Sequence, residues 1–177
     1  MALLIACAAP TLPAQKFGTA ENLAPYIPTP QVLVERMLVA GRVKPGDVVY
    51  DLGSGDGRIV IMAAQKFGAR AVGVEIRPDL CQRALEQIKA KGLEGRVSML
   101  EDSALRVDLS PATVVTMFLL TSSNERLKPN LEKYLKPGAR VVSNEFPIRG
   151  WKPEEVVRVK TGKMEHTIFV YEMGKIR

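Results

Sequence analysis

The stretch "VVYDLGSGDGRIVI", residues 48–61, contains two apolar runs separated by a turn with three glycines at alternate positions. The unbroken Val-Val-Tyr of the first run is typical of a strand that is buried on both faces of a parallel sheet. The second run begins a helix that we expect to end at Gly68. A glycine turn between such a strand and such a helix lets the backbone approach a ligand closely, because no side chain stands in the way.

The chain repeats this alternation of strand and helix on both sides of the opening stretch. Helices are expected at 32–39, 57–67, 78–91 and within 122–138, and strands at 48–52, 71–76, 96–102, 112–120, 139–146, 155–160 and 167–173. The last two strands meet at a short Thr-Gly-Lys turn without a helix between them. We therefore predict an α/β, Rossmann-like fold: a mostly parallel seven-stranded sheet with a C-terminal antiparallel hairpin and helices on both faces.

Composition limits the classes of protein that remain. A chain of 177 residues with 46% hydrophobic and 25% charged residues fits one globular domain. No apolar run reaches the roughly 18 residues that a membrane-spanning helix needs. The net charge of +6 arises mainly in residues 89–177, which hold sixteen Lys/Arg against eleven Asp/Glu. A solvated surface explains this excess, and an acidic or nucleic-acid partner is the alternative.

The first residues differ from the rest of the chain. "MALLIACAAPTLPAQ", residues 1–15, is apolar and uncharged, but it lacks the basic segment of a secretory signal. We divide the chain into residues 1–20, an apolar N-terminal arm or signal remnant, and residues 21–177, a single domain. Cys7 and Cys81 are too few for a disulfide scaffold.

The spacing of the glycines indicates the kind of ligand. A dinucleotide fingerprint has the form G-x-G-x-x-G, whereas here the order is Gly53-x-Gly55-x-Gly57. Asp56 lies inside the turn, where its charge would oppose a phosphate. S-adenosylmethionine, which has a sulfonium, an ammonium and no phosphate, fits this turn better. Asp51 can accept a hydrogen bond from that ammonium, directly or through water.

Acidic residues also end the next two predicted strands. Glu75 lies at the end of the second strand, where a carboxylate can accept hydrogen bonds from both ribose hydroxyls, as in dinucleotide enzymes. Asp102 is a candidate acceptor for the adenine amino group, and the Ser103 backbone N–H can donate to a ring nitrogen. Any one of these acids can equally be a solvated or helix-capping carboxylate. Acids at three successive strand ends favour a cofactor site.

The motifs "DLGSGDG" (51–57) and "GVEI" (73–76) resemble those of the class I S-adenosylmethionine-dependent methyltransferases. The resemblance extends over residues 25–173, through "PYIPTP", "TVVTMFLLTSSNERLKPNLEKYLKPGARVVSNEF", "RGW" and "HTIFVY". These segments are similar to the small archaeal and bacterial protein-lysine methyltransferases of broad specificity. The eukaryotic relatives of that family are mitochondrial enzymes that methylate lysines of the ATP synthase c-subunit and the adenine nucleotide translocator.

This resemblance implies a Rossmann-like methyltransferase fold, S-adenosylmethionine as cofactor, and methyl transfer to the side-chain amine of lysine in protein substrates. In such families the N-terminal proline-rich loop covers the cofactor, so Tyr26 and Thr29 are expected to contact its methionine end. The apolar residues 1–15 depart from the family pattern. They leave the location of the protein open and do not bear on its chemistry.

Methyl transfer to an amine is an in-line displacement that needs no metal, but the lysine must be neutral although its reference pKa is about 10.4. An apolar channel and the nearby sulfonium both lower that pKa. Phe118, beside Leu119 at the end of the fourth strand, is expected to form such a channel. Asn144 and Glu145 end the fifth strand and could receive the amine; Glu145 would take its proton or bind its charge. Ordinary core packing and structural hydrogen bonds are the alternative roles.

Other functions remain possible at this stage. An RNA methyltransferase or a small-molecule methyltransferase would use the same cofactor site, although "FLLT" (118–121) lacks the Asn/Asp-Pro-Pro-aromatic motif of many base-amino methyltransferases. A dehydrogenase or a non-catalytic cofactor-binding module is a further alternative. His166, the single histidine, is expected to be structural and not a metal ligand. We expect a monomer that acts on lysine-bearing proteins. We expect it in the cytoplasm, because exported enzymes lack a supply of the cofactor.

Overall fold

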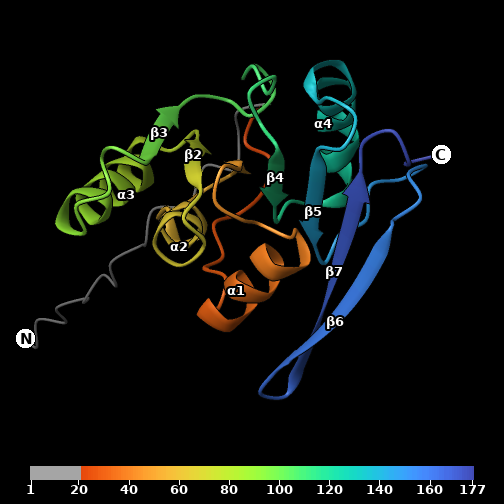
Figure 1. Cartoon of the computed structure of the whole chain (residues 1–177), viewed down its shortest axis with the longest axis horizontal. Coiled ribbons are helices and arrows are strands. Elements are labelled where there is room, and N and C mark those ends of the chain that lie inside the picture. Colours follow the sequence, from red (N-terminus) through yellow and green to blue (C-terminus); the bar gives the residue numbers. More distant parts are fainter. Residues whose placement is uncertain (1–20) are drawn as a thin grey trace, which may run out of the picture.

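The computed structural model describes residues 21–177 (Figure 1), so the expectations for residues 1–20 lie outside the described residues. The described helices are α1 (Gln31–Ala40), α2 (Arg58–Phe67), α3 (Pro78–Ala90) and α4 (Thr121–Tyr134). The described strands are β1 (Val48–Leu52), β2 (Arg70–Glu75), β3 (Val97–Glu101), β4 (Val114–Met117), β5 (Arg140–Asn144), β6 (Glu155–Thr161) and β7 (Met164–Glu172). No helix within residues 21–177 has the length and apolarity that crossing a bilayer requires.

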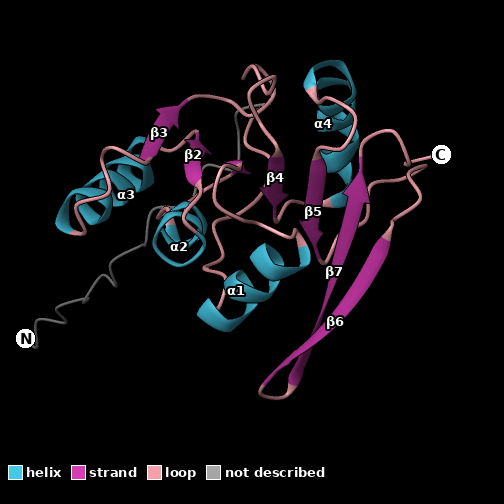
Figure 2. Ribbon diagram, viewed as in Figure 1, coloured by secondary structure: helices cyan, strands magenta, loops and turns pink. Residues whose placement is uncertain are grey.

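All the described strands join one sheet in the order β3-β2-β1-β4-β5-β7-β6. Strand β1 pairs in parallel with β2 and β4, and β4 pairs in parallel with β5. Strand β7 then runs antiparallel to β5 and to β6, forming the long hairpin at one side of Figure 2. The predicted seven-stranded sheet with a C-terminal antiparallel hairpin is confirmed. The reversal of strand order around β1 and β4 leaves a crevice at the carboxyl ends of these strands.

Two hydrophobic cores cover the two faces of the sheet, as the binary pattern of the helices requires. One core holds Leu33 and Met37 of α1 together with Val60 of α2. The other holds Leu127 and Leu131 of α4. Helices α1 and α2 therefore lie on the face opposite α4 (Figure 1), which confirms the prediction of helices on both faces.

Strands β4 and β5 are shorter than the predicted ranges 112–120 and 139–146. After β4 the chain must leave the sheet within three residues, because α4 begins at Thr121. After β5, Glu145 adopts a left-handed backbone conformation with φ of 62°, which ends the extended run. As a result, Phe118 and Glu145 lie on loops at the carboxyl edge of the sheet and not inside strands.

Tyr171 gives a direct test of the packing on the α4 side. Its side chain is fully buried with its ring 5.5 Å from that of Trp151, and its hydroxyl accepts a hydrogen bond from the Ile148 N–H at 3.0 Å. Tyr171→Phe should lower the free energy of unfolding in urea by about 1–3 kcal/mol, because the buried N–H loses its acceptor. Tyr134→Phe, on a partly exposed ring, should change it by less than about 0.5 kcal/mol. Equal effects of the two changes would contradict this account.

Candidate active site

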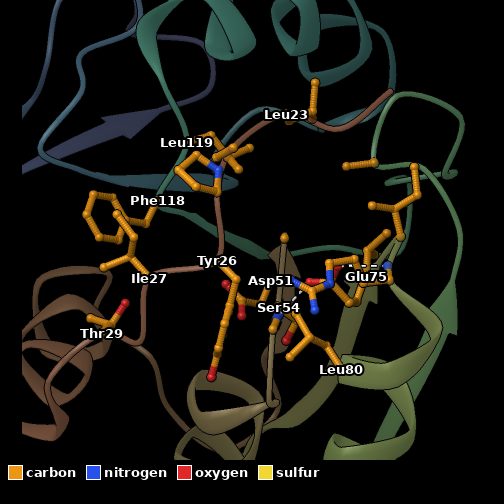
Figure 3. Close-up of a pocket in the computed structure, with 18 of the residues that line it drawn as sticks. Leu23, Tyr26, Ile27, Thr29, Asp51, Ser54, Glu75, Leu80, Phe118 and Leu119 are labelled. Carbon is orange, nitrogen blue, oxygen red and sulfur yellow. Dashed lines mark hydrogen bonds between the residues drawn. The ribbon is translucent and has the colours of Figure 1, made fainter. Parts of the chain in front are cut away.

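A cavity lies at the carboxyl ends of the parallel strands, beneath the segment 21–29 (Figure 3). Ten of the predicted site residues line it: Tyr26, Thr29, Asp51, Gly53, Gly55, Asp56, Glu75, Asp102, Phe118 and Glu145. The other three, Gly57, Ser103 and Asn144, are not among the lining residues. Phe118 and Ile27 lie on one side of the cavity in Figure 3, and Glu75 and Leu80 lie on the other. The cavity thus joins an acidic end to an aromatic end.

The glycine turn supports both the cavity and the fold. Gly55 has φ of 57°, and a Cβ atom there would come within 2.6 Å of the Tyr26 ring. Gly57, which caps α2 with φ of 78°, has no room for a Cβ because Ala84 of α3 would lie 2.9 Å away. Gly55 therefore brings backbone and the covering segment together, whereas Gly57 serves the packing of α3 on the turn.

Glu75 organises the turn through its carboxylate. Oε2 accepts a hydrogen bond from the Gly55 N–H at 2.8 Å, and Oε1 accepts one from the Arg77 N–H at 2.9 Å. Each carboxylate oxygen still has a second lone pair. Glu75 can therefore hold the two loops that flank the cavity and also accept the ribose hydroxyls, as its place in the sequence predicts.

Asp51 is buried at the end of β1 and accepts a hydrogen bond from the Thr116 hydroxyl of β4 at 2.7 Å. Burial raises the pKa of this carboxyl to about 6, against the opposing effect of the Thr116 hydrogen bond. No cation pairs with Asp51 among the described residues, and the buried Ser54 hydroxyl has no hydrogen-bond partner among them. This combination fits the ammonium of S-adenosylmethionine, which Asp51 and Ser54 would hold.

The raised pKa makes cofactor affinity depend on pH. The ammonium binds the ionised carboxylate, so lowering the pH from about 7 to about 5 should weaken adenosylhomocysteine binding about tenfold in calorimetry. The stability of the protein without cofactor depends on pH in the opposite direction. Because folding raises the pKa of the Asp51 carboxyl, this group favours the folded state at low pH, and the contribution is lost as the pH rises from about 4 to about 6. Asp51→Asn should bind more weakly and show no such pH dependence. A wild-type affinity that is constant over this range would contradict the assignment.

Asp56 does not present a free charge to the cavity. It forms an ion pair with Arg58 at 2.6 Å, and this partner lowers the pKa of its carboxyl. Arg58 also donates a hydrogen bond to the Thr29 carbonyl oxygen at 2.6 Å. The predicted repulsion between Asp56 and a phosphate is therefore weakened, because Arg58 neutralises the carboxylate. Through the bond from Arg58 to Thr29, this ion pair holds the 21–29 segment over the glycine turn.

Asp102 lines the cavity as predicted, but the Ser103 N–H is already used. It donates to the Asp102 carboxylate at 2.6 Å, and Arg106 donates to the same oxygen at 2.8 Å. Ser103 itself is fully buried. The proposed contact between the Ser103 N–H and adenine stays a prediction, and it requires the Asp102 side chain to release that N–H.

The end of the cavity at Phe118 contains an aromatic pair that the sequence pattern indicated only in part. The Phe118 and Phe146 rings stack at 6.2 Å between centroids, and both line the cavity together with Glu145. Asn144 is fully buried, and neither polar atom of its side chain has a hydrogen-bond partner among the described residues. Alternate residues of a strand point to the same face, so the Asn144 side chain lies on the face of Val142, which packs in the core that contains α1. The structure therefore does not bring Asn144 to the cavity.

Sequence reasoning also missed contacts that hold the covering segment. The Ser123 hydroxyl at the start of α4 donates to the Leu23 carbonyl oxygen, and Arg106 forms an ion pair with Glu21. Leu23 packs into the core on the α4 side. The only available sequence signal was the apolar pattern of "NLAPYI" (22–27), which is too short to show what it would cover.

The strand order, the glycine turn and the acids at successive strand ends define a class I S-adenosylmethionine-dependent methyltransferase. The sequence matches the ANTKMT methyltransferase domain over residues 51–155, and the chain belongs to this family. A crystal structure of an RNA methyltransferase from Salinibacter ruber in complex with S-adenosyl-L-homocysteine is 43% identical, with a TM-score of 0.78. That likeness covers 83% of this chain and 94% of the other.

Curated relatives are similar over most of this chain. A protein-lysine N-methyltransferase of Saccharolobus islandicus is 55% identical over 85% of this chain and 94% of its own length. The human lysine N-methyltransferase of the ATP synthase c-subunit is 32% identical over 86% of this chain and 63% of its own length. The mouse adenine nucleotide translocase lysine N-methyltransferase is 38% identical over 79% of this chain and 61% of its own length. The two mammalian proteins thus extend well beyond the region that this chain matches.

Proposed function

We propose that this enzyme transfers the methyl group of S-adenosylmethionine to the side-chain amine of lysine in protein substrates. The observation that carries the proposal is the lining of one cavity, which combines the carboxylates of Asp51, Glu75 and Glu145 with two stacked phenylalanines. The names of the Saccharolobus, human and mouse relatives, all lysine methyltransferases, support the same substrate class.

The residues at the aromatic end suit a lysine side chain. Phe118 and Phe146 would pack against its methylene groups, which excludes water around the amine. Glu145 would bind the ammonium and accept one proton, leaving the electron pair on nitrogen. S-adenosylmethionine, when bound, supplies the electrophilic methyl group, whose bond to sulfur breaks with its electron pair as the bond to nitrogen forms. Holding the amine in line with that methyl group is the main contribution of the protein.

RNA is the second candidate substrate. The 43% identical structure from Salinibacter ruber carries the description RNA methyltransferase, and the chain has a net charge of +6. A basic surface binds nucleic acid through phosphates and does not by itself place a base in the cavity. Small molecules with an amine are a third class that the same cofactor site would serve.

A labelling experiment distinguishes these substrates. Purified enzyme and tritiated S-adenosylmethionine are added to a heat-treated lysate, to the same lysate after nuclease digestion, and to the same lysate after acetylation of its lysines. We expect label in protein that survives nuclease and disappears on acetylation, and tandem mass spectrometry should place the methyl groups on lysine. Label confined to RNA or to small molecules would contradict the proposal.

We also propose that the enzyme works as a monomer in the cytoplasm, where its cofactor is made. Sedimentation of the purified protein at micromolar concentration and cell fractionation test the two parts separately. A stable dimer, or recovery outside the cytoplasm, would contradict the corresponding part.

A further inference from the structure

Glu145 is held by the C-terminal hairpin through a chain of hydrogen bonds. Its Oε1 lies 2.5 Å from Nδ1 of His166 on β7, and Nε2 of the same ring lies 2.7 Å from the Thr161 hydroxyl of β6. The backbone N–H of Glu145 donates to the Thr167 carbonyl oxygen at 2.7 Å. His166 is only 9% exposed, so the imidazole is shielded between the hairpin and the loop after β5.

The Glu145 carboxylate indicates the tautomer of the ring, because a carboxylate oxygen accepts a hydrogen bond and therefore favours a proton on Nδ1. A neutral imidazole has one N–H donor and one acceptor nitrogen. When the Thr161 hydroxyl donates to Nε2, the proton of the ring is on Nδ1 and donates to the Glu145 carboxylate. These hydrogen bonds then hold the Glu145 carboxylate in one orientation beside the cavity that this residue lines.

We propose that His166 and Thr161 are positioning residues that orient Glu145 toward the lysine amine during methyl transfer. This inference rests on the proposed function. It assigns a role in that function to the β6–β7 hairpin, although His166 and Thr161 do not line the cavity. Glu145 lies on the loop after β5, where apart from His166 its carboxylate accepts only a long hydrogen bond, 3.4 Å from the Thr167 N–H, so His166 is its main side-chain support. The hairpin would thus be part of the active site, although it is the last segment of the chain.

Nitrogen NMR tests the hydrogen-bond chain without any substrate. His166 is the single histidine of the chain, so the ring signals of nitrogen-15-labelled protein need no assignment. We expect the pattern of a neutral ring with the proton on Nδ1, and a clear shift of these signals in Glu145→Gln and in Thr161→Val. A proton on Nε2 of the neutral ring, or signals that neither variant changes, would overturn the proposal.

Kinetics test the effect on the reaction. His166→Ala should lower kcat about 10- to 100-fold while the Kd for adenosylhomocysteine stays within about twofold, as expected when a support of a reacting group is lost. His166→Asn should recover part of the activity, because its amide N–H can reach the place of Nδ1–H. The double variant Glu145→Gln/His166→Ala should be no slower than Glu145→Gln alone, because each change removes the same interaction between the two side chains.

Lys160→Ala, an exposed change on the same hairpin, is the control and should keep wild-type kcat and Tm. Full activity of His166→Ala, or losses of Glu145→Gln and His166→Ala that multiply in the double variant, would overturn the positioning role. The proposed function would stand in that case, provided that the wild-type enzyme methylates lysine. Transfer by the wild-type enzyme only to RNA or small molecules would overturn the proposed function and this inference together.

Discussion

Glu75→Gln is expected to weaken the binding of adenosylhomocysteine about 100- to 1,000-fold. The carboxylate accepts hydrogen bonds from the Gly55 and Arg77 N–H groups and is the expected acceptor for the ribose. A glutamine side chain has the same shape but carries an NH₂ group in place of one carboxylate oxygen. The backbone N–H that donated to that oxygen then faces another donor, so its hydrogen bond is lost and the two groups repel each other. Losing this bond together with the charge-assisted bond expected from a ribose hydroxyl costs about 3–4 kcal/mol, which corresponds to this change in Kd.

Glu101→Gln is the matched control for this measurement. Glu101 is the register neighbour of Glu75 on β3, is exposed and is not among the residues that line the cavity. Calorimetric titration should give the control a wild-type Kd. If Glu75→Gln kept its affinity within about threefold while remaining folded, the role of this carboxylate in the cofactor site would be wrong.

Glu145→Gln should lower kcat for lysine methylation about 100-fold or more, because the amide can neither take a proton nor neutralise the ammonium. Adenosylhomocysteine should bind with a Kd within about twofold of wild type, since the cofactor contacts expected from Asp51 and Glu75 are unaffected. Single-turnover transfer of labelled methyl groups from pre-bound cofactor measures this step directly.

Glu165→Gln is the control, because Glu165 is exposed on the same strand as His166 and is not among the residues that line the cavity. It should transfer methyl groups at the wild-type rate. A Glu145→Gln enzyme with wild-type single-turnover rate would show that desolvation by Phe118 and Phe146 alone prepares the amine. Glu145 would then have a structural role only.

The order of strands and helices was predictable in part because local signals mark where some of the helices begin and end. Gly68 ends α2 in a left-handed conformation, and Pro78 begins α3. Such signals depend on neighbouring residues only. The acids at strand ends were predictable for a similar reason, because parallel strands bring their carboxyl ends to one edge.

The partners of these side chains were not predictable from the sequence. Arg58 pairs with Asp56 and reaches the Thr29 carbonyl, 29 positions away, only when the covering segment is folded over the turn. His166 meets Glu145 because β7 runs antiparallel to β5 in a particular register, with Asn144 opposite Ile168. That register decides which side chains meet, and it joins residues that are far apart in the sequence, so neighbouring residues did not reveal the contact.

The choice between Asn144 and Glu145 also depended on a structural detail. Adjacent residues of a strand point to opposite faces, so the place where β5 ends decides which of the two reaches the cavity. Strand β5 ends at Asn144, because the next residue, Glu145, is in a left-handed conformation; the Asn144 side chain therefore stays on the face of the sheet opposite α4. A glutamate is not the residue that normally marks such a turn, so the sequence offered no signal for it.

Every role assigned above depends on S-adenosylmethionine binding in the cavity between the 21–29 segment and the glycine turn. Calorimetric titration of the wild-type protein with adenosylhomocysteine, and in parallel with NAD, measures this binding most directly. We predict saturable heat and a rise in Tm with adenosylhomocysteine, and neither with NAD. Tight binding of NAD together with no heat and no rise in Tm for adenosylhomocysteine would contradict the account.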